Sequence, residues 1–104
     1  MDVNIHDWKL FKEKLPEWQE RYMDKLEKEY VQIILNGDKL PSEKFWELKK
    51  AIDRDKKSPG VGLELRKSEM EIDIMLLLKD KAISIEDLND FSNELLDRIK
   101  SYIE

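Results

Sequence analysis

Apolar residues in the first third of the chain recur at steps of three and four positions. The stripe consists of Leu15, Trp18, Tyr22, Leu26, Tyr30 and Ile33. This spacing predicts an amphipathic helix from Pro16 to about Leu35 with one face against a core. Proline suits the first turn of a helix, where its missing N–H costs nothing, so Pro16 is expected to begin this helix. The residues before it are expected to form a separate short helix over 8–14, which Asp7 can cap.

The middle of the chain predicts a third helix and one ambiguous stretch. Ser42 is the expected start of a helix through about Asp55, preceded by Asn36-Gly37-Asp38, where Gly37 supplies a left-handed turn. The buried line of this helix is expected to be Phe45, Leu48 and Ile52, with Trp46 beside it. Residues 60–67 are either helical from Pro59 or extended. The spacing Ser68-x-x-Glu71 is that of a capping box and favours a helix over 68–80.

The C-terminal third contains two serines placed as N-caps, Ser84 and Ser92. Each follows an apolar residue and has another apolar residue four positions beyond it, the arrangement of a hydrophobic staple. We expect helices over 85–90 and 93–103. The buried side of the last helix is expected to be Leu95, Leu96, Ile99, Tyr102 and Ile103. The whole pattern predicts an all-α fold: one domain over 1–104, a compact bundle of about five helices, two of them short, and no sheet.

Composition excludes several classes of function but does not identify one. The chain has 104 residues, of which 41% are charged, with a net charge of −5 and no cysteine. Disulfides, thiolate chemistry and cysteine-based metal sites are excluded. The apolar run at 74–78 is far shorter than the roughly 20 residues that span a bilayer. The polar N-terminus does not look like a secretory signal, so we expect a cytoplasmic protein that does not span a membrane.

The sequence contains no pattern of residues that suits catalysis or metal binding. Asp53 to Glu64 has the length of an EF-hand loop, but Lys57 and Pro59 occupy positions that oppose calcium binding. His6 is the only histidine and has no cysteine or second histidine to join it. The three glycines match no phosphate-binding loop. We therefore expect no enzyme activity, no catalytic residue, no metal and no cofactor.

Basic residues concentrate in residues 44–67, where eight lysines and arginines face four acids. The candidate binding residues there are Lys49, Lys50, Arg54, Lys56, Lys57, Arg66 and Lys67. Nucleic-acid or nucleotide binding through this segment is one hypothesis, although the acidity of the whole chain argues against a general nucleic-acid binder. A helix-turn-helix over 72–103 is disfavoured because its last helix has as many acids as bases.

The three tryptophans, Trp8, Trp18 and Trp46, complete the candidate binding residues. Helical spacing favours core positions for aromatic residues, but a chain of this size has little room to enclose all three. An exposed tryptophan would indicate a surface for a partner, because tryptophan is enriched at protein interfaces.

Three runs of sequence carry a resemblance to known proteins. They are WKLFKEKLPEW from Trp8, SEKFWEL from Ser42 and DLNDFSNEL from Asp87. Together they resemble a group of small, uncharacterised, all-helical bacterial proteins of about this length, and the resemblance implies no functional residue.

The sequence thus leaves three hypotheses about function. The leading one is a non-enzymatic protein–protein interaction or regulatory module with a protein partner of unknown identity. The second is the nucleic-acid or nucleotide binder described above. The third is a structural homodimer that buries the aromatic face.

Overall fold

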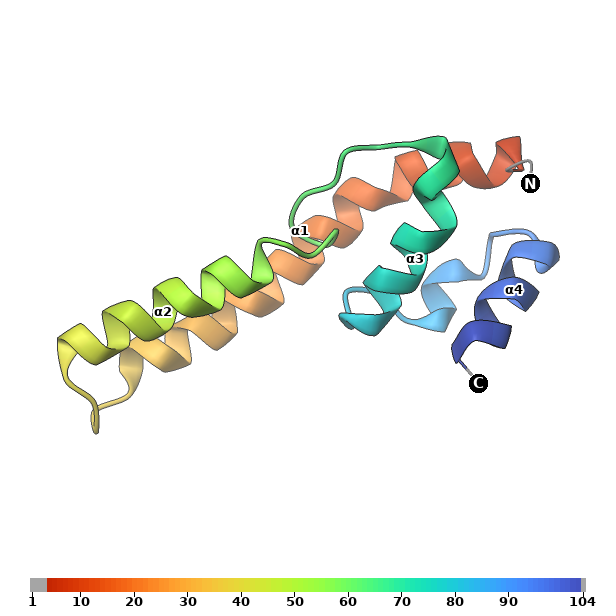
Figure 1. Ribbon diagram of the computed structural model, residues 1–104. Coiled ribbons are helices and arrows are strands. Elements are labelled where there is room, and N and C mark those ends of the chain that lie inside the picture. Colours follow the sequence, from red (N-terminus) through yellow and green to blue (C-terminus); the bar gives the residue numbers. More distant parts are fainter. Residues whose placement is uncertain (1–3, 104) are drawn as a thin grey trace.

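The computed structural model describes residues 4–103 and contains helices but no strand in that range. Figure 1 shows an elongated molecule, with principal extents of 52 × 26 × 19 Å. The elements are α1 (Ile5–Leu35), α2 (Pro41–Asp55), the short 3-10 helix η1 (Lys67–Glu69), α3 (Met70–Lys79), the 3-10 helix η2 (Ile85–Leu88) and α4 (Asn93–Ile103). The all-α prediction is confirmed. The described residues form four α-helices rather than five, and their elongated arrangement does not match the expected compact bundle.

Helix α1 is continuous where the sequence predicted two helices. It runs for 31 residues with Pro16 inside it, and its N-cap is Asn4, whose side chain accepts the N–H groups of His6 and Asp7. The predicted break at Pro16 and cap at Asp7 are therefore wrong. Pro16 lies on the exposed side of the helix. The Lys12 carbonyl, which loses its helical partner to the proline, can be hydrated there.

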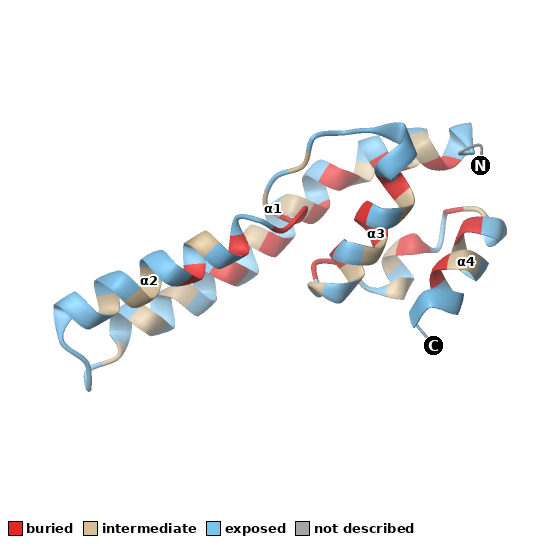
Figure 2. Ribbon diagram, in the orientation of Figure 1, coloured by how far each residue is buried: buried red, intermediate tan, exposed pale blue. Residues whose placement is uncertain are grey.

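The core forms around the first part of α1. The predicted stripe supplies Leu15, Trp18, Tyr22 and Leu26, all buried, and Phe11 one turn earlier extends it. Tyr30 and Ile33, its last two members, are half-buried. Against it pack residues from α3, η2 and α4, among them the fully buried Ile74, Leu77, Leu88, Leu95 and Ile99. Figure 2 shows this buried set on one half of the molecule, while the far end of the α1–α2 pair is mostly exposed.

The C-terminal part follows the sequence prediction in its order of elements. Residues 62–66 have no helical structure, so the extended alternative is correct for this part of 60–67. Residues 60 and 61 belong to a turn, and Lys67 begins η1, which leads into α3. Ser68 lies inside η1 and caps nothing. Ser92 is a cap as predicted, because its hydroxyl accepts the N–H of Leu95.

The last two predicted helices differ from the structure in detail. The predicted helix over 85–90 is the shorter η2. Helix α4 has the predicted bounds, but Tyr102 and Ile103 are exposed rather than buried. They belong to the last turn of α4, residues 100–103, which is exposed throughout, whereas Ile99 just before it is fully buried.

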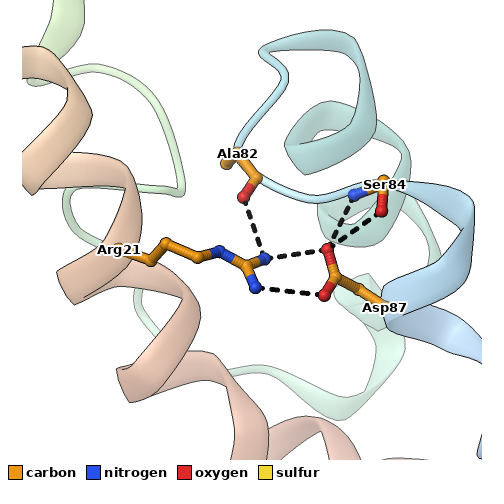
Figure 3. Close-up of polar contacts among 4 residues, drawn as sticks. All are labelled: Arg21, Ala82, Ser84 and Asp87. Atoms are coloured by element: carbon orange, nitrogen blue, oxygen red, sulfur yellow. Dashed lines mark hydrogen bonds and ion pairs between the residues drawn. The ribbon is translucent and has the colours of Figure 1, made fainter.

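An ion pair fixes η2 against α1. Figure 3 shows the Arg21 guanidinium donating to both carboxylate oxygens of Asp87, at 3.1 and 2.8 Å, and to the carbonyl of Ala82. The same carboxylate accepts the N–H of Ser84 at 2.8 Å. Burial alone would raise the pKa of Asp87, but the hydrogen bonds from Arg21 and Ser84 outweigh it and hold that pKa below its usual value.

Helix α2 begins at Pro41, one residue before the predicted start. The carboxylate of Glu43 accepts the N–H of Leu40 at 3.0 Å, so Ser42 is not the cap. The turn before it contains no left-handed glycine, which contradicts the role predicted for Gly37. Figure 1 shows α2 running back alongside the second half of α1, so that the two helices form a hairpin that projects from the core.

Candidate protein-binding surface

The hairpin is joined along its inner face by polar contacts as well as apolar ones. Near its base, the Tyr30 hydroxyl donates to Asp55 at 2.7 Å, and Arg54 pairs with the same carboxylate. Burial and the Asp55 carboxylate raise the pKa of Tyr30 to about 12, whereas Arg54 holds the pKa of Asp55 below its usual value. Lys44 donates to the carbonyl of Ile34 near the tip. Together these contacts fix the two helices side by side.

The inner face of α2 is not the one predicted. Ala51 and Asp55 are its buried residues, whereas Phe45 and Ile52, expected in the buried line, are 63% and 42% exposed. Leu48 is half-buried. The difference has a simple cause: Phe45 to Ile52 lie on the part of α2 that packs on α1 alone, and only the last turn of α2 approaches α3. A single neighbouring helix covers a narrower face of α2 than several packed helices would.

One flank of the hairpin is mainly apolar, although the charged residues Glu27, Lys49 and Lys56 share its helical spacing. On α1, Met23, Tyr30 and Ile34 recur at helical spacing, and on α2, Phe45 and Ile52 lie seven residues apart and so face the same way. Met23, Tyr30 and Ile52 line one common cavity, which shows that the two rows meet on the same side. We call this surface the apolar flank: Met23, Tyr30, Ile34, Phe45, Leu48 and Ile52.

The opposite flank is polar. Lys25, Glu29 and Gln32 on α1 follow helical spacing, as do Glu43, Glu47, Lys50 and Arg54 on α2. This polar flank carries charges of both signs, and Glu47 pairs with Lys39 at 2.7 Å. Polar side chains on both flanks would be enough to keep the hairpin soluble. The exposed apolar residues of the other flank therefore require an explanation, since contiguous exposed apolar surface indicates a binding site.

A cavity of about 300 Å³ opens on the apolar flank near the base of the hairpin. Its walls are mainly apolar, with Glu27 and Lys56 as the charged residues. The lining residues are Met23, Leu26, Glu27, Tyr30, Ile52, Lys56 and Val61. The cavity is large enough to receive an apolar side chain from a partner.

The tip of the hairpin adds exposed aromatic surface. Trp46 is 62% exposed, and its ring meets the Phe45 ring edge-on with 5.2 Å between centroids. Leu35 and Leu40 are also exposed there. Of the other two candidate tryptophans, Trp18 is buried in the core, whereas Trp8 is half-buried beside Phe11 with Lys12 over its ring. Trp46 is thus the tryptophan that the fold leaves available.

The candidate basic residues do not form one patch. Lys49, Lys50, Arg54, Lys56 and Lys57 lie on or directly after α2, whereas Arg66 and Lys67 lie where the chain enters η1. Figure 1 shows that these two places are separated along the molecule. Carboxylates also neutralise several of them: Asp53 pairs with both Lys49 and Lys56, Asp55 with Arg54, and Glu64 with Arg66. The segment therefore presents a weaker field than its sequence predicts.

A second cavity, of about 390 Å³, lies between α1, the end of α2 and α3. Its central polar groups have protein partners: the Ser58 hydroxyl donates to Asp80 at 2.7 Å and accepts the N–H of Gly60, while Asp55 is held by Tyr30 and Arg54. These contacts join the loop after α2 to the core, so we assign them a structural role.

Comparisons with known proteins indicate no function, so the proposal below depends on the surface of the hairpin. No protein-family model, curated protein or solved structure matches the chain. Within residues 4–103, no group of three or more acids and histidines is placed to hold a metal ion. None of the helices in that range is both long enough and apolar enough to cross a membrane.

Proposed function

We propose that this protein is a non-enzymatic binding module whose projecting hairpin docks another protein through its apolar flank. The observation that supports this most is the exposure of Phe45 and Trp46, together with Ile34 and Leu40, at the far end of the hairpin. Fully burying a large apolar side chain in an interface, instead of leaving it in water, contributes about 1.5–3 kcal/mol to binding. Aromatic residues also carry much of the energy at protein interfaces.

The arrangement of the molecule supports the same proposal. The core at one end fixes the first half of α1, and the hydrogen bond between Tyr30 and Asp55 holds α2 alongside the second half. A partner therefore meets a surface that is already ordered, which reduces the entropy lost on binding. The charged residues of the polar flank disfavour docking of an apolar partner there, so we expect the partner to bind on the apolar flank.

A photo-crosslinking experiment tests the proposal. A photoreactive phenylalanine analogue replaces Phe45 on the apolar flank or, as a matched control, Gln32 on the polar flank, in the cell that makes the protein. We expect a discrete covalent adduct from position 45 that is absent from position 32 and disappears when Ile52→Glu is added. Equal adduct patterns from both positions would contradict the proposal.

Binding of nucleic acid through residues 44–67 remains the alternative. It predicts an affinity that falls steeply with salt, because lysines and arginines release counterions from phosphates. Titration with duplex DNA and single-stranded RNA at low and high salt distinguishes the two functions. Docking through the apolar flank predicts no salt-sensitive nucleic-acid binding.

A further inference from the structure

We infer that the partner of the apolar flank is a second copy of this chain, bound antiparallel so that two hairpins form a four-helix bundle. This inference rests on the proposed function and identifies the occupant of the same surface. Two observations carry it: the flank contains both a protruding side chain and a cavity that can receive it, and its size suits a dimer.

The protruding side chain and the cavity lie on the same face of α2. Phe45 protrudes near the tip, and Ile52, seven residues later, lines the cavity near the base. Seven residues correspond to about 10 Å along a helix. In an antiparallel pair with its two-fold axis beside Leu48, Phe45 of each copy reaches the cavity of the other. Each copy thus gives one side chain and receives one, as a two-fold symmetric interface requires.

The antiparallel direction also agrees with the position of the core. The core lies at the base of the hairpin, on the first half of α1, and the tip is free of other elements (Figure 2). When two hairpins pair in opposite directions, the two cores lie at opposite ends of the new bundle. A parallel pair would bring both cores to the same end, where they would compete for space.

The exposed area fits an interface of ordinary size. Ile34, Phe45 and Ile52 of the apolar flank, with Leu40 in the adjoining turn, are between 42% and 65% exposed. A large apolar side chain has about 200 Å² of surface, so these four offer about 400 Å² together. That is close to the apolar share, a little over half, of the ~800 Å² that each partner buries in a standard interface.

The charges beside the flank do not oppose self-pairing. Glu27 and Lys56, at the rim of the cavity, have opposite signs, and Lys49 is already paired with Asp53. No single sign of charge dominates the flank, so two copies meet without strong repulsion. A flank dominated by one sign would instead have indicated a partner of opposite charge.

The first test measures mass by light scattering and sedimentation from low micromolar to millimolar protein. We expect a monomer–dimer equilibrium whose dissociation constant rises about 100-fold or more in Phe45→Glu, because this variant removes an aromatic anchor and brings a charge into an apolar cavity. The control Gln32→Glu, on the polar flank, should change it by less than about threefold. Circular dichroism should show both variants equally helical, since both positions are exposed in the monomer.

The second test fixes the geometry with an engineered thiol, which is simple because the chain has no cysteine. With a short bis-maleimide reagent, Leu48→Cys beside the proposed axis should cross-link to a covalent dimer in high yield. Lys50→Cys on the polar flank should not. A dimer that cross-links equally at both positions, or that survives Phe45→Glu, would overturn the inference.

Failure of this inference can be told apart from failure of the proposed function. A chain that stays monomeric at millimolar concentration, yet gives a photo-adduct to a different protein from position 45, rejects self-pairing and retains the binding function. A monomer that gives no specific adduct rejects both.

Discussion

The carboxylate of Asp7, in the first turns of α1, holds Ser92 at the start of α4. One oxygen accepts the Ser92 N–H at 2.8 Å and the other accepts its hydroxyl at 2.6 Å, across 85 residues of sequence. Asp7 is 1% exposed. A residue that looks in sequence like a local helix cap thus joins the two ends of the chain.

Replacing Asp7 with alanine should lower the free energy of unfolding by about 3 kcal/mol. The change leaves two donors of the half-buried Ser92 without their acceptor, and hydrogen bonds to charged groups are the costly ones to lose. Urea denaturation measures the loss. The control Asp24→Ala removes an exposed carboxylate that pairs with Lys28 in α1, and should cost less than about 0.5 kcal/mol. Equal losses in the two variants would contradict the role assigned to Asp7.

Asp73 should make the protein less stable as the pH rises through about 6. Burial, with the nearby charge of Glu69, raises the pKa of Asp73 to about 6, and its Oδ2 atom has no hydrogen-bond partner among the described residues. Because the folded state binds this proton more tightly than the unfolded state, this group stabilises the fold at low pH and loses that contribution as the proton dissociates.

The variant Asp73→Asn should therefore melt at a higher temperature than the parent above pH 7, with a difference that shrinks toward about pH 4, where the parent is protonated too. Thermal denaturation followed by circular dichroism across this range gives the comparison. Asp97→Asn, at an exposed position of α4, should show no such trend. A difference between Asp73→Asn and the parent that does not vary with pH would rule out this explanation.

Two glycines of the loop after α2 should respond in opposite ways to alanine. A Cβ atom on Gly60 would lie 2.4 Å from Cδ2 of Tyr22, whereas one on Gly62 would meet nothing within 4 Å. Neither glycine has positive φ, so the difference is steric alone. Gly60→Ala should cost about 1–3 kcal/mol. Gly62→Ala should be neutral or slightly stabilising, because it reduces the entropy of the unfolded chain. Denaturant unfolding of both variants decides, and similar values would be evidence against this packing of Tyr22.

Replacing Pro16 with alanine should stabilise the protein by about 1–2 kcal/mol. Pro16 lies inside α1, where it removes one backbone hydrogen bond, and an alanine would restore the donor to the Lys12 carbonyl. Part of the gain is offset because alanine leaves the unfolded chain more flexible. Urea denaturation measures the net effect. A destabilised variant would show that α1 needs the proline for its shape.

The candidate binding surface was only partly visible in the sequence. The exposed Trp46 was among the predicted binding residues, but Phe45 and Ile52 were expected inside a core. Helical periodicity identifies residues that share a face, yet it does not reveal what covers that face. The apolar flank could be recognised only once the hairpin was seen to extend beyond α3 and α4.

The sequence by itself determined the features that depend on neighbouring residues. These include the all-α class, the stripe from Leu15 to Leu26, the cap at Ser92 with the bounds of α4, and the end of α1 at Leu35. Backbone hydrogen bonds and caps form within a few residues, so short-range patterns encode them.

Only the tertiary structure decided the features that depend on distant residues. Helix α1 continues through Pro16 because the stripe on both sides of it packs against one core, and burial of those residues outweighs one missing hydrogen bond. Asp7 accepts from Ser92 because the fold brings α4 beside the start of α1. The same packing covers one half of α1 and leaves the hairpin with an apolar flank, because an apolar face is buried only where another element reaches it.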